Sequence, residues 1–370
     1  MKTLVLTRTD LARLAAAVGI DTLMDEVIES LEGALRAFDP ATTRIPLRDG
    51  FAYDTPHTGL LEWMPILALG RSVLIKTVGY HPDNPARGIP TVLATICLYD
   101  VASGSLTAVA DGVLATALRT GAASAVASRL LARSESRVLG LVGCGMQAVA
   151  QLHALGRCFK LEGVLIHDVD PQVERSFVRR TAGFGVPVRP APRREVEASA
   201  DLLCTATSVA PGEGPVIDGD ALRPWVHINA IGSDFRGKTE LPAELVRRSW
   251  VCADFREQAL REGECQHLAP GEVGSSLDEL VKEPLSFARR RDETTIFDST
   301  GFALEDHVAL EVLLAHAKRL GLGTELPLES LAYDPWDPYA VVAEVEMAEA
   351  AVGSLGSTKT PFSSLSRRSA

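Results

Sequence analysis

The stretch Val138–His153, VLGLVGCGMQAVAQLH, has the residue types and spacing to bind a dinucleotide. A short branched apolar run is followed by Gly143, Gly145 and Ala148 at G-x-G-x-x-G/A spacing, and then by a helical pattern. The first glycine permits a tight turn, the second lets backbone approach a pyrophosphate, and the small third residue lets the helix pack on the strand. The helix N-terminus then offers free N–H groups to phosphates. A purely structural strand–turn–helix is the alternative interpretation.

An acidic residue after the next apolar run strengthens the cofactor interpretation. Val164–Ile166 is followed by Asp168, 25 residues after Gly143. A carboxylate near this offset accepts hydrogen bonds from the adenosine ribose and repels a 2′-phosphate. The pattern therefore favours NAD over NADP as the cofactor.

Other chemically capable residues lie in apolar runs or directly after them. Glu62 and Lys76 each occur within a predicted strand, where a charge is costly unless it is paired or exposed at an edge. Thr207, Asp234 and Ser299 each follow a predicted strand. Ligands of open α/β sheets bind beyond the carboxyl ends of the strands, so we expect chemistry there.

The arrangement of apolar runs predicts an α/β fold with two domains. Alternating strands and helices from 138 to 297 predict a Rossmann-type, doubly wound parallel sheet. The strand-rich stretch 60–109 predicts a separate α+β domain, to which the helix 308–320 returns. Residues 39–58 are rich in Pro, Thr and Asp and are predicted to be loop.

We therefore expect three parts of the chain. Residues 1–118 with 313–350 would form a substrate-binding and dimerisation domain built from both chain ends. Residues 119–312 would form the NAD-binding domain. The Ser-, Thr-, Lys- and Arg-rich stretch 351–370 would be a disordered tail. A helix at 111–133 is rich in small residues, which predicts close packing against another element.

Composition narrows the function classes. The net charge of −11 argues against nucleic-acid or anionic-membrane partners, and no apolar run is long enough to span a bilayer. The six cysteines form no C-x-x-C pair, so we expect neither disulfides nor a metal site. Reduced thiols are typical of cytoplasmic proteins.

Eight stretches together resemble the ornithine cyclodeaminase/mu-crystallin family. They are Glu62–Pro65, Lys76–Pro82, Gly88–Thr91, Leu118–Ser124, Gly143–Ala148, His227–Gly232, Gly237–Glu240 and Phe297–Ala303. Three further runs, Ala117–Arg133, Ala259–Gln266 and Asp334–Tyr339, are most similar to family members that act on L-lysine in actinobacterial secondary metabolism.

The resemblance implies roles for individual residues. Arg48, Lys76 and Arg119 would surround the substrate α-carboxylate, and Thr300 would lie beside the substrate. Asp234 and Glu62 would be the catalytic acidic pair, with Asp234 as the principal proton carrier. The positions that match NAD contacts in the family are Thr91, Arg119, Gly143, Gly145, Met146, Gln147, Asp168, Thr207, Asn229, Ala230, Lys238 and Ser299.

The implied reaction converts L-lysine to L-pipecolate and ammonia, with NAD recycled within one turnover. Arginine side chains suit a carboxylate, and a neighbouring carboxylate can take protons from an α-ammonium. The same chemistry on L-ornithine, which would give L-proline, differs by one methylene and stays open. An NAD(P)H-dependent imine reductase or amino-acid dehydrogenase, and a non-enzymatic binder of the mu-crystallin type, are further alternatives. We expect a homodimer that takes a small diamino acid.

Overall fold

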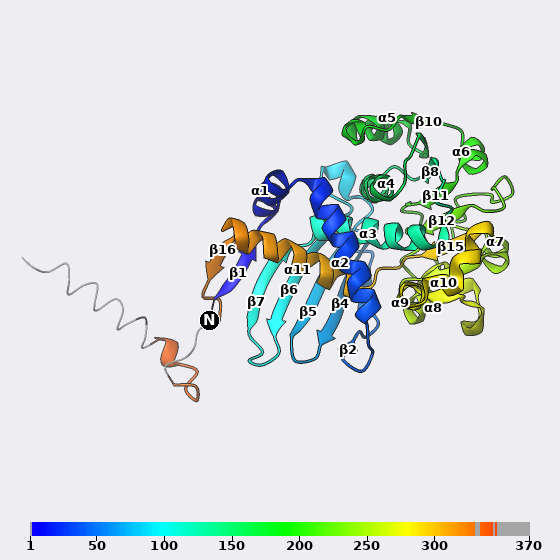
Figure 1. The fold of residues 1–370 in the computed structure, drawn as a ribbon. Helices are drawn as coiled ribbons and strands as arrows, with labels where there is room; N and C mark the ends of the chain where they lie inside the picture. Colours follow the sequence, from blue (N-terminus) through cyan, green and yellow to red (C-terminus); the bar gives the residue numbers. More distant parts are fainter. Residues whose placement is uncertain (1, 330–333, 343–344, 346–370) are drawn as a thin grey trace, which may run out of the picture. The chain divides into compact units, whose positions relative to one another are not determined.

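The computed structural model describes residues 2–329, 334–342 and 345. Residues 4–325 form one compact unit, which contains both sheets and every site residue discussed below (Figure 1). The expected tail at 351–370 lies outside the described residues. Within the described part, no helix is long and apolar enough to cross a membrane.

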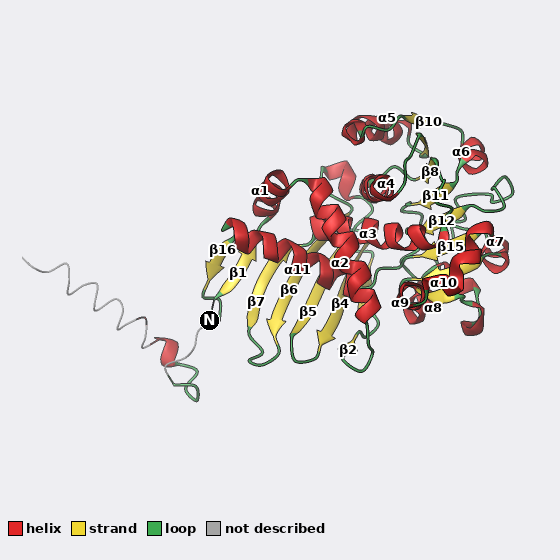
Figure 2. Ribbon diagram, in the orientation of Figure 1, coloured by secondary structure: helices red, strands yellow, loops and turns green. Residues whose placement is uncertain are grey.

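The first sheet is mixed and carries helices on one face (Figures 1 and 2). Its strand order is β16-β1-β7-β6-β5-β4-β2, with β3 also paired to β4; β1 runs parallel to β7, and the pairs from β7 to β2 and between β3 and β4 are antiparallel. The strands are β1 (Thr3–Leu6), β2 (Thr43–Arg44), β3 (Asp49–Tyr53), β4 (Gly59–Ala68), β5 (Ser72–Tyr80), β6 (Val92–Asp100) and β7 (Leu106–Asp111); β16 (Thr324–Leu326) follows late in the chain.

Three helices cover this sheet because each has one apolar face. They are α1 (Arg8–Val18), α2 (Ile20–Ala37) and α11 (Ala303–Leu320). Leu23, Val27 and Leu31 of α2 are fully buried and share a core with Ile66 and Leu74 of the sheet. Burial of such side chains is the main driving force for this packing.

The prediction that residues 39–58 are loop is wrong in part. The segment contains β2 and β3, and β3 pairs with β4 from Asp49 opposite Trp63 to Tyr53 opposite Gly59. Strands this short lack a sequence period that stands out from their polar surroundings. Their formation depends on the long neighbouring strand β4, which supplies the hydrogen-bonding edge.

The second sheet is wholly parallel and has the predicted Rossmann-type architecture. Its strand order is β10-β9-β8-β11-β12-β15-β13-β14. The chain adds β9 and β10 on one side of β8 and the later strands on the other, so the direction in which strands are added reverses at β8. The strands are β8 (Val138–Val142), β9 (Gly163–His167), β10 (Val188–Pro190), β11 (Leu202–Thr205), β12 (His227–Ala230), β13 (Trp250–Ala253), β14 (Ser275–Ser276) and β15 (Thr295–Asp298). A ligand is expected beyond the carboxyl end of β8, where the order reverses.

Helices pack on both faces of the parallel sheet, which confirms the predicted fold class. They are α4 (Met146–Cys158), α5 (Pro171–Arg180), α6 (Arg193–Ser199), α7 (Ala243–Arg248), α8 (Arg256–Glu262), α9 (Leu277–Lys282) and α10 (Pro284–Phe287). Short 3-10 helices are η1 (Asn84–Arg87), η2 (Ala182–Phe184), η3 (Glu264–His267), η4 (Pro270–Glu272) and η5 (Ala288–Asp292).

Helix α3 (Val113–Leu131) packs against elements associated with both sheets. It lies against α2 and α11 as well as α4, β12 and β15. A Cβ on Gly121 would lie 2.8 Å from the Ala150 carbonyl oxygen, so the close approach of α3 to α4 requires glycine there. Both α3 and α11 span the boundaries of the expected domain division, at 118 and 313, and that division stays a prediction.

Candidate active site

Arg48 is the centre of a buried charged cluster. It lies just before β3, and its Nε donates to Glu262 Oε1 at 2.9 Å while lying 3.6 Å from Glu62 Oε1. Its other nitrogens donate to two backbone oxygens, that of Thr300 at 2.9 Å and that of Asp234. One guanidinium therefore joins three carboxylate-bearing segments, from β4, the end of α8 and the loop after β12.

A close approach between β3 and β4 makes this cluster fit. Gly50 lies opposite Glu62, and a Cβ there would lie 2.3 Å from the Leu61 carbonyl oxygen and 2.8 Å from Glu62 Cγ. Any side chain at position 50 would push the two strands apart. Gly50 thus permits Arg48, two residues earlier, to reach Glu62.

The two carboxyl groups of the predicted acidic pair differ in proton affinity. Burial, opposed by the Arg48 charge, raises the pKa of Glu62 to about 7. Burial also opposes ionisation of Asp234, but the Lys238 ammonium and the Arg48 guanidinium outweigh it and lower the pKa of Asp234. At neutral pH one member can therefore hold a proton while the other is ionised, as a pair with divided acid and base roles requires.

The loop that carries Asp234 is fixed by polar contacts. Lys238 Nζ donates to Asp234 Oδ1 at 2.9 Å and lies 5.3 Å from the Tyr80 ring centroid. Gln266 accepts from the Gly237 amide at 2.7 Å and donates to the Lys238 carbonyl oxygen at 3.2 Å. These bonds hold the chain around Asp234 in one conformation.

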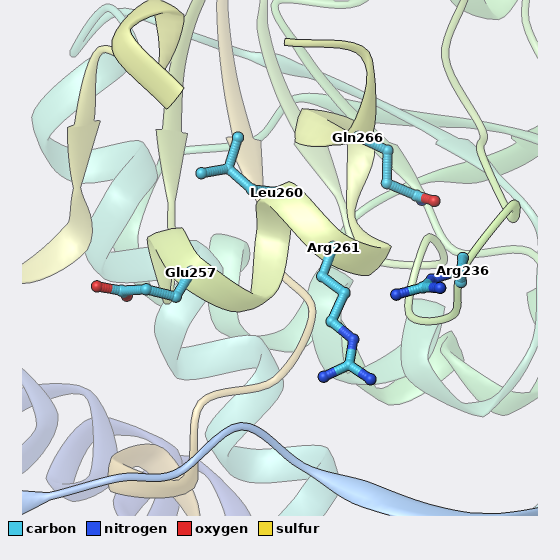
Figure 3. A pocket seen from close by; sticks show the side chains of 5 residues that line it. All are labelled: Arg236, Glu257, Leu260, Arg261 and Gln266. Atoms are coloured by element: carbon cyan, nitrogen blue, oxygen red, sulfur yellow. The ribbon is translucent and has the colours of Figure 1, made fainter. Parts of the chain in front are cut away.

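A cavity of about 470 Å³ opens beside this loop (Figure 3). Its lining residues come from the loop, from α8 and from η3: Arg236, Glu257, Leu260, Arg261 and Gln266. Arg236 follows Asp234 by two residues and Arg261 directly precedes Glu262, so the segments that line the cavity also carry two of the site carboxylates.

Lys76 and Arg119 form a second buried cluster. Lys76 is fully buried on β5, and its Nζ donates to Asp306 Oδ1 at 2.7 Å. Arg119 Nε lies 3.4 Å from the same oxygen, and its Nη1 donates to Glu305 Oε2 at 2.8 Å. Burial, opposed by Asp306, lowers the pKa of Lys76 to about 8.

The turn at Thr300–Gly301 connects the two clusters. The Thr300 carbonyl oxygen accepts from Arg48, and a Cβ on Gly301 would lie 3.0 Å from Arg119 Nη2. Buried Asp254 accepts from the Gly301 amide at 2.6 Å and from the Thr300 hydroxyl at 3.1 Å. Three predicted substrate residues, Arg48, Arg119 and Thr300, are thus brought to one place.

The glycine-rich turn has the geometry expected of a phosphate-binding loop. Gly143 has φ +92°, and a Cβ there would lie 2.5 Å from the Ala206 carbonyl oxygen, so only glycine fits. Asp168 Oδ2 accepts from the Cys144 amide at 2.7 Å, and Arg180 donates to the Cys144 carbonyl oxygen at 2.6 Å. The turn is therefore clamped from both sides.

The N-terminus of α4 has room and unused polar groups for a cofactor. A Cβ on Gly145 would have no atom within 4 Å, and Met146 is 41% exposed. Gln147 Oε1 is buried and has no hydrogen-bond partner among the described residues. A cavity of about 680 Å³ joins Gly145 and Met146 to Thr91 of the loop before β6. The residues present fit a bound dinucleotide phosphate.

The remaining predicted cofactor residues lie at the carboxyl ends of the central strands. Thr207 donates through its amide and its hydroxyl to Glu240 Oε1, each at 2.7 Å. Asn229 and Ala230 are fully buried, and the Asn229 amide group donates to Ser128. The Ser299 hydroxyl donates to Asp254 at 3.2 Å. Their contact with a cofactor stays a prediction.

Several carboxylates of the site were missed by the sequence analysis. Asp254 follows an apolar run, and Glu305 and Asp306 begin an apolar helix, but Glu262 occurs in a run rich in charged residues, where an acidic residue is usually solvent-exposed. Glu240, which bonds the loops after β11 and β12, was missed for the same reason. Asp254, Glu305 and Asp306 did carry a usable signal, because Asp254 directly follows a strand and the other two begin a strongly apolar helix.

Comparison with known proteins agrees with this geometry. The family model described as ornithine cyclodeaminase/mu-crystallin family matches residues 8–319. The chain belongs to this family. Three relatives within or close to it are similar over nearly the whole chain.

An L-lysine cyclodeaminase of Streptomyces rapamycinicus is 43% identical over 343 residues, which cover 92% of this chain and 100% of the relative. A solved structure of a lysine cyclodeaminase, which concerns its recognition of L-lysine, L-ornithine and L-2,4-diaminobutyric acid, is 50% identical in sequence and has a TM-score of 0.90. The match covers 92% of this chain and 99% of the chain in that structure. A dimeric archaeal alanine dehydrogenase with bound NAD is 33% identical with a TM-score of 0.79, and covers 89% of this chain and 100% of its own.

Membership of the ornithine cyclodeaminase/mu-crystallin family confirms the resemblance drawn from eight short stretches of sequence. The family match extends from α1 to the last turn of α11 and therefore includes both charged clusters and the glycine-rich turn.

Proposed function

We propose that the protein is an L-lysine cyclodeaminase that converts L-lysine to L-pipecolate and ammonia with recycled NAD. The observation that carries the proposal is the pair of carboxyl groups with opposite pKa shifts that Arg48 brings together: its Nε lies 3.6 Å from Glu62 Oε1, and it donates to the backbone oxygen of Asp234, whose carboxyl pKa its charge helps to lower. The similarity to an L-lysine cyclodeaminase over 92% of the chain supports the choice of substrate.

NAD would be held where the turn after β8 meets α4. The amides at the start of α4 donate to the pyrophosphate in such a unit, and the buried Gln147 Oε1 is an acceptor that a hydroxyl or amide donor of the cofactor could satisfy. The Asp168 carboxylate already fixes the turn and stands where the adenosine ribose binds in this fold. When bound, NAD would accept a hydride from the substrate Cα and return it to the ring after closure.

Asp234 and Glu62 would divide the proton transfers between them. Asp234, kept ionised by Lys238 and Arg48, can accept a proton from the α-ammonium before hydride leaves Cα. Glu62, with a pKa of about 7, can hold the proton that departing ammonia needs. We therefore propose Glu62 as the proton donor, whereas the resemblance implies Asp234 in that role.

The substrate carboxylate would bind among Arg48, Lys76 and Arg119. Arginine and lysine donors suit a carboxylate, and the two clusters flank the same turn, Thr300–Gly301. The carboxylates Glu62, Glu262 and Asp234 leave the opposite side of the site acidic, which suits a substrate that carries two amines.

Ornithine is the second candidate substrate. One methylene in a pocket changes binding by only about 1–3 kcal/mol, so the same residues could serve both. The specific observation in its favour is the similar lysine cyclodeaminase structure, which addresses L-ornithine as well as L-lysine.

We also propose a homodimer formed through the uncovered face of the first sheet. Phe51, Leu61 and Leu93 are between 41% and 65% exposed, and the ring centroids of Phe51 and Trp63 lie 5.5 Å apart. Alternation along the strands points them away from the buried face, and exposed apolar patches of this kind mark interfaces. The dimeric alanine dehydrogenase relative supports this proposal. A cytoplasmic location is likewise proposed from the free cysteines.

A product analysis by mass spectrometry tests the proposed function. L-lysine, L-ornithine and L-arginine would each be incubated with the protein and NAD as the sole added cofactor. We expect L-pipecolate from L-lysine as the main product. Absence of a cyclic amino acid from every diamino acid would refute the proposal.

A further inference from the structure

The contact between the first turn of α11 and Arg119 of α3 contains an unusual concentration of unsatisfied polar atoms. Glu305 Oε1, Asp306 Oδ2 and Arg119 Nε are all buried without a hydrogen-bond partner among the described residues. Buried polar atoms are nearly always bonded in folded proteins, so three together need an explanation. Of the three, Arg119 Nε is the donor that a substrate carboxylate could satisfy, whereas the two oxygens are acceptors and belong to the groups that hold the cations.

The geometry shows what these carboxylates do. Asp306 Oδ1 accepts from Lys76 Nζ at 2.7 Å and lies 3.4 Å from Arg119 Nε, so a single oxygen holds both cations. Glu305, the preceding residue, binds the other end of Arg119 through Nη1 at 2.8 Å. Because successive residues of a helix point in different directions, the pair can grip the two cations from different sides.

We infer that Asp306 and Glu305 are positioning residues which hold Lys76 and Arg119 side by side as a two-pronged clamp for the substrate carboxylate. This inference rests on the proposed function, because it needs a substrate carboxylate at that place. Lys76 belongs to the first sheet and Arg119 to α3, so two cations from separate elements must be brought together against their mutual repulsion. Asp306 supplies the compensating charge.

The protonation of Lys76 depends on this arrangement. The groups that face Lys76 are Arg119 from α3 and the carboxyls of Glu305 and Asp306 from α11. Burial and Arg119 disfavour the ammonium form, whereas Asp306 and Glu305 favour it, and the pKa of Lys76 lies at about 8 as a result. Without the Asp306 charge, a fully buried amine beside an arginine would lose its proton near neutral pH.

A plainly structural role is the competing explanation. Acidic residues in the first turn stabilise a helix through its dipole, and Glu305 and Asp306 satisfy that preference. A structural role predicts lower thermal stability when either is changed, with ligand discrimination and pH dependence unaltered. The clamp predicts a selective loss of carboxylate binding.

Two fragments of lysine, each lacking one of its functional groups, separate these roles. 6-Aminohexanoate is lysine without the α-amine, and cadaverine is lysine without the carboxylate. Their dissociation constants would be measured by calorimetry on NAD-loaded protein for wild type, Asp306→Asn and Asp306→Glu. Glu311→Gln, an exposed carboxylate on the same helix, is the matched control.

We expect Asp306→Asn to raise the dissociation constant of 6-aminohexanoate roughly 30-fold, because a buried charged anchor is lost, while the dissociation constant of cadaverine changes less than about threefold. The loss of 6-aminohexanoate binding with rising pH should move from near pH 8 to below neutrality. Asp306→Glu should restore part of the affinity, and Glu311→Gln should behave as wild type. The inference would be overturned if both fragments lost affinity equally, or if 6-aminohexanoate binding to Asp306→Asn were lost at the same pH as in wild type.

Other outcomes keep the two proposals separate. If Asp306→Asn does not fold, Glu305→Ala is measured in the same way, and an unchanged preference for 6-aminohexanoate over cadaverine overturns the inference. If the wild-type protein discriminates the fragments as expected but releases no ammonia from L-lysine, the proposed function fails and the clamp stands. If it releases ammonia but Asp306→Asn keeps wild-type discrimination, the clamp fails alone.

Discussion

The replacement Glu62→Gln tests the proposed division of proton transfers. Glu62 is 8% exposed and has a pKa of about 7, so near pH 7 about half of the molecules carry the proton needed by the leaving ammonia. Each further pH unit should lower that fraction about tenfold. A glutamine of the same shape cannot donate this proton, and loss of a general acid costs about 10²–10⁴-fold in rate, or roughly 3–5 kcal/mol of barrier.

The assay is the initial rate of ammonia release from L-lysine between pH 5.5 and 9 at saturating NAD. In wild type, kcat should fall above pH 7 as Glu62 loses its proton. Glu62→Gln should be slow throughout, and its rate should show only the weaker fall near pH 8 that loss of the Lys76 proton causes. Glu244→Gln, an exposed carboxylate on α7, is the control and should follow wild type. A Glu62→Gln variant with the wild-type rate and pH profile would refute the reasoning.

Four further outcomes follow from the structure. Asp234→Asn should abolish turnover yet leave NAD affinity near normal in a fluorescence titration, since the glycine-rich turn is held by Asp168 and Arg180 and not by Asp234; retained turnover would remove its assigned role. Gly143→Ala should lower the free energy of unfolding in urea by at least about 2 kcal/mol and weaken NAD binding, because Gly143 has a positive φ and a Cβ there would lie 2.5 Å from the Ala206 carbonyl oxygen. Leu93→Asp on the exposed sheet face should shift the mass measured by light scattering from dimer to monomer, and an unchanged mass would argue against that interface. Burial, opposed by Arg119, raises the pKa of Glu305 to about 8, so the folded state binds that proton more tightly than the unfolded state does, and wild-type stability falls as pH rises from 4.5 towards 8. Glu305→Gln lacks this titration, so its melting temperature relative to wild type should increase over that range. A constant difference would contradict the pKa shift.

The parallel sheet and the glycine-rich turn could be predicted from sequence because local chemistry determines them. The alternating runs from 138 to 297 carry the period of each element, and Gly143 has a positive φ that only glycine adopts freely. Strands β2 and β3 could not be predicted, because they are too short to show a period and form only on the edge provided by β4.

The site was predicted in part for similar reasons. Charged residues inside apolar strands, such as Glu62 and Lys76, stand out against their surroundings, and the structure shows both buried and paired. Glu262 became recognisable only once the fold brought it to Arg48. Sequence distance hides such contacts, since 214 residues separate Arg48 from Glu262.

The balance of products from L-lysine tests the central claim most directly. With NAD present in substoichiometric amount, we expect one ammonia and one L-pipecolate for each L-lysine consumed, with no net rise in NADH absorbance. Steady accumulation of NADH, or recovery of unreacted L-lysine, would contradict the account.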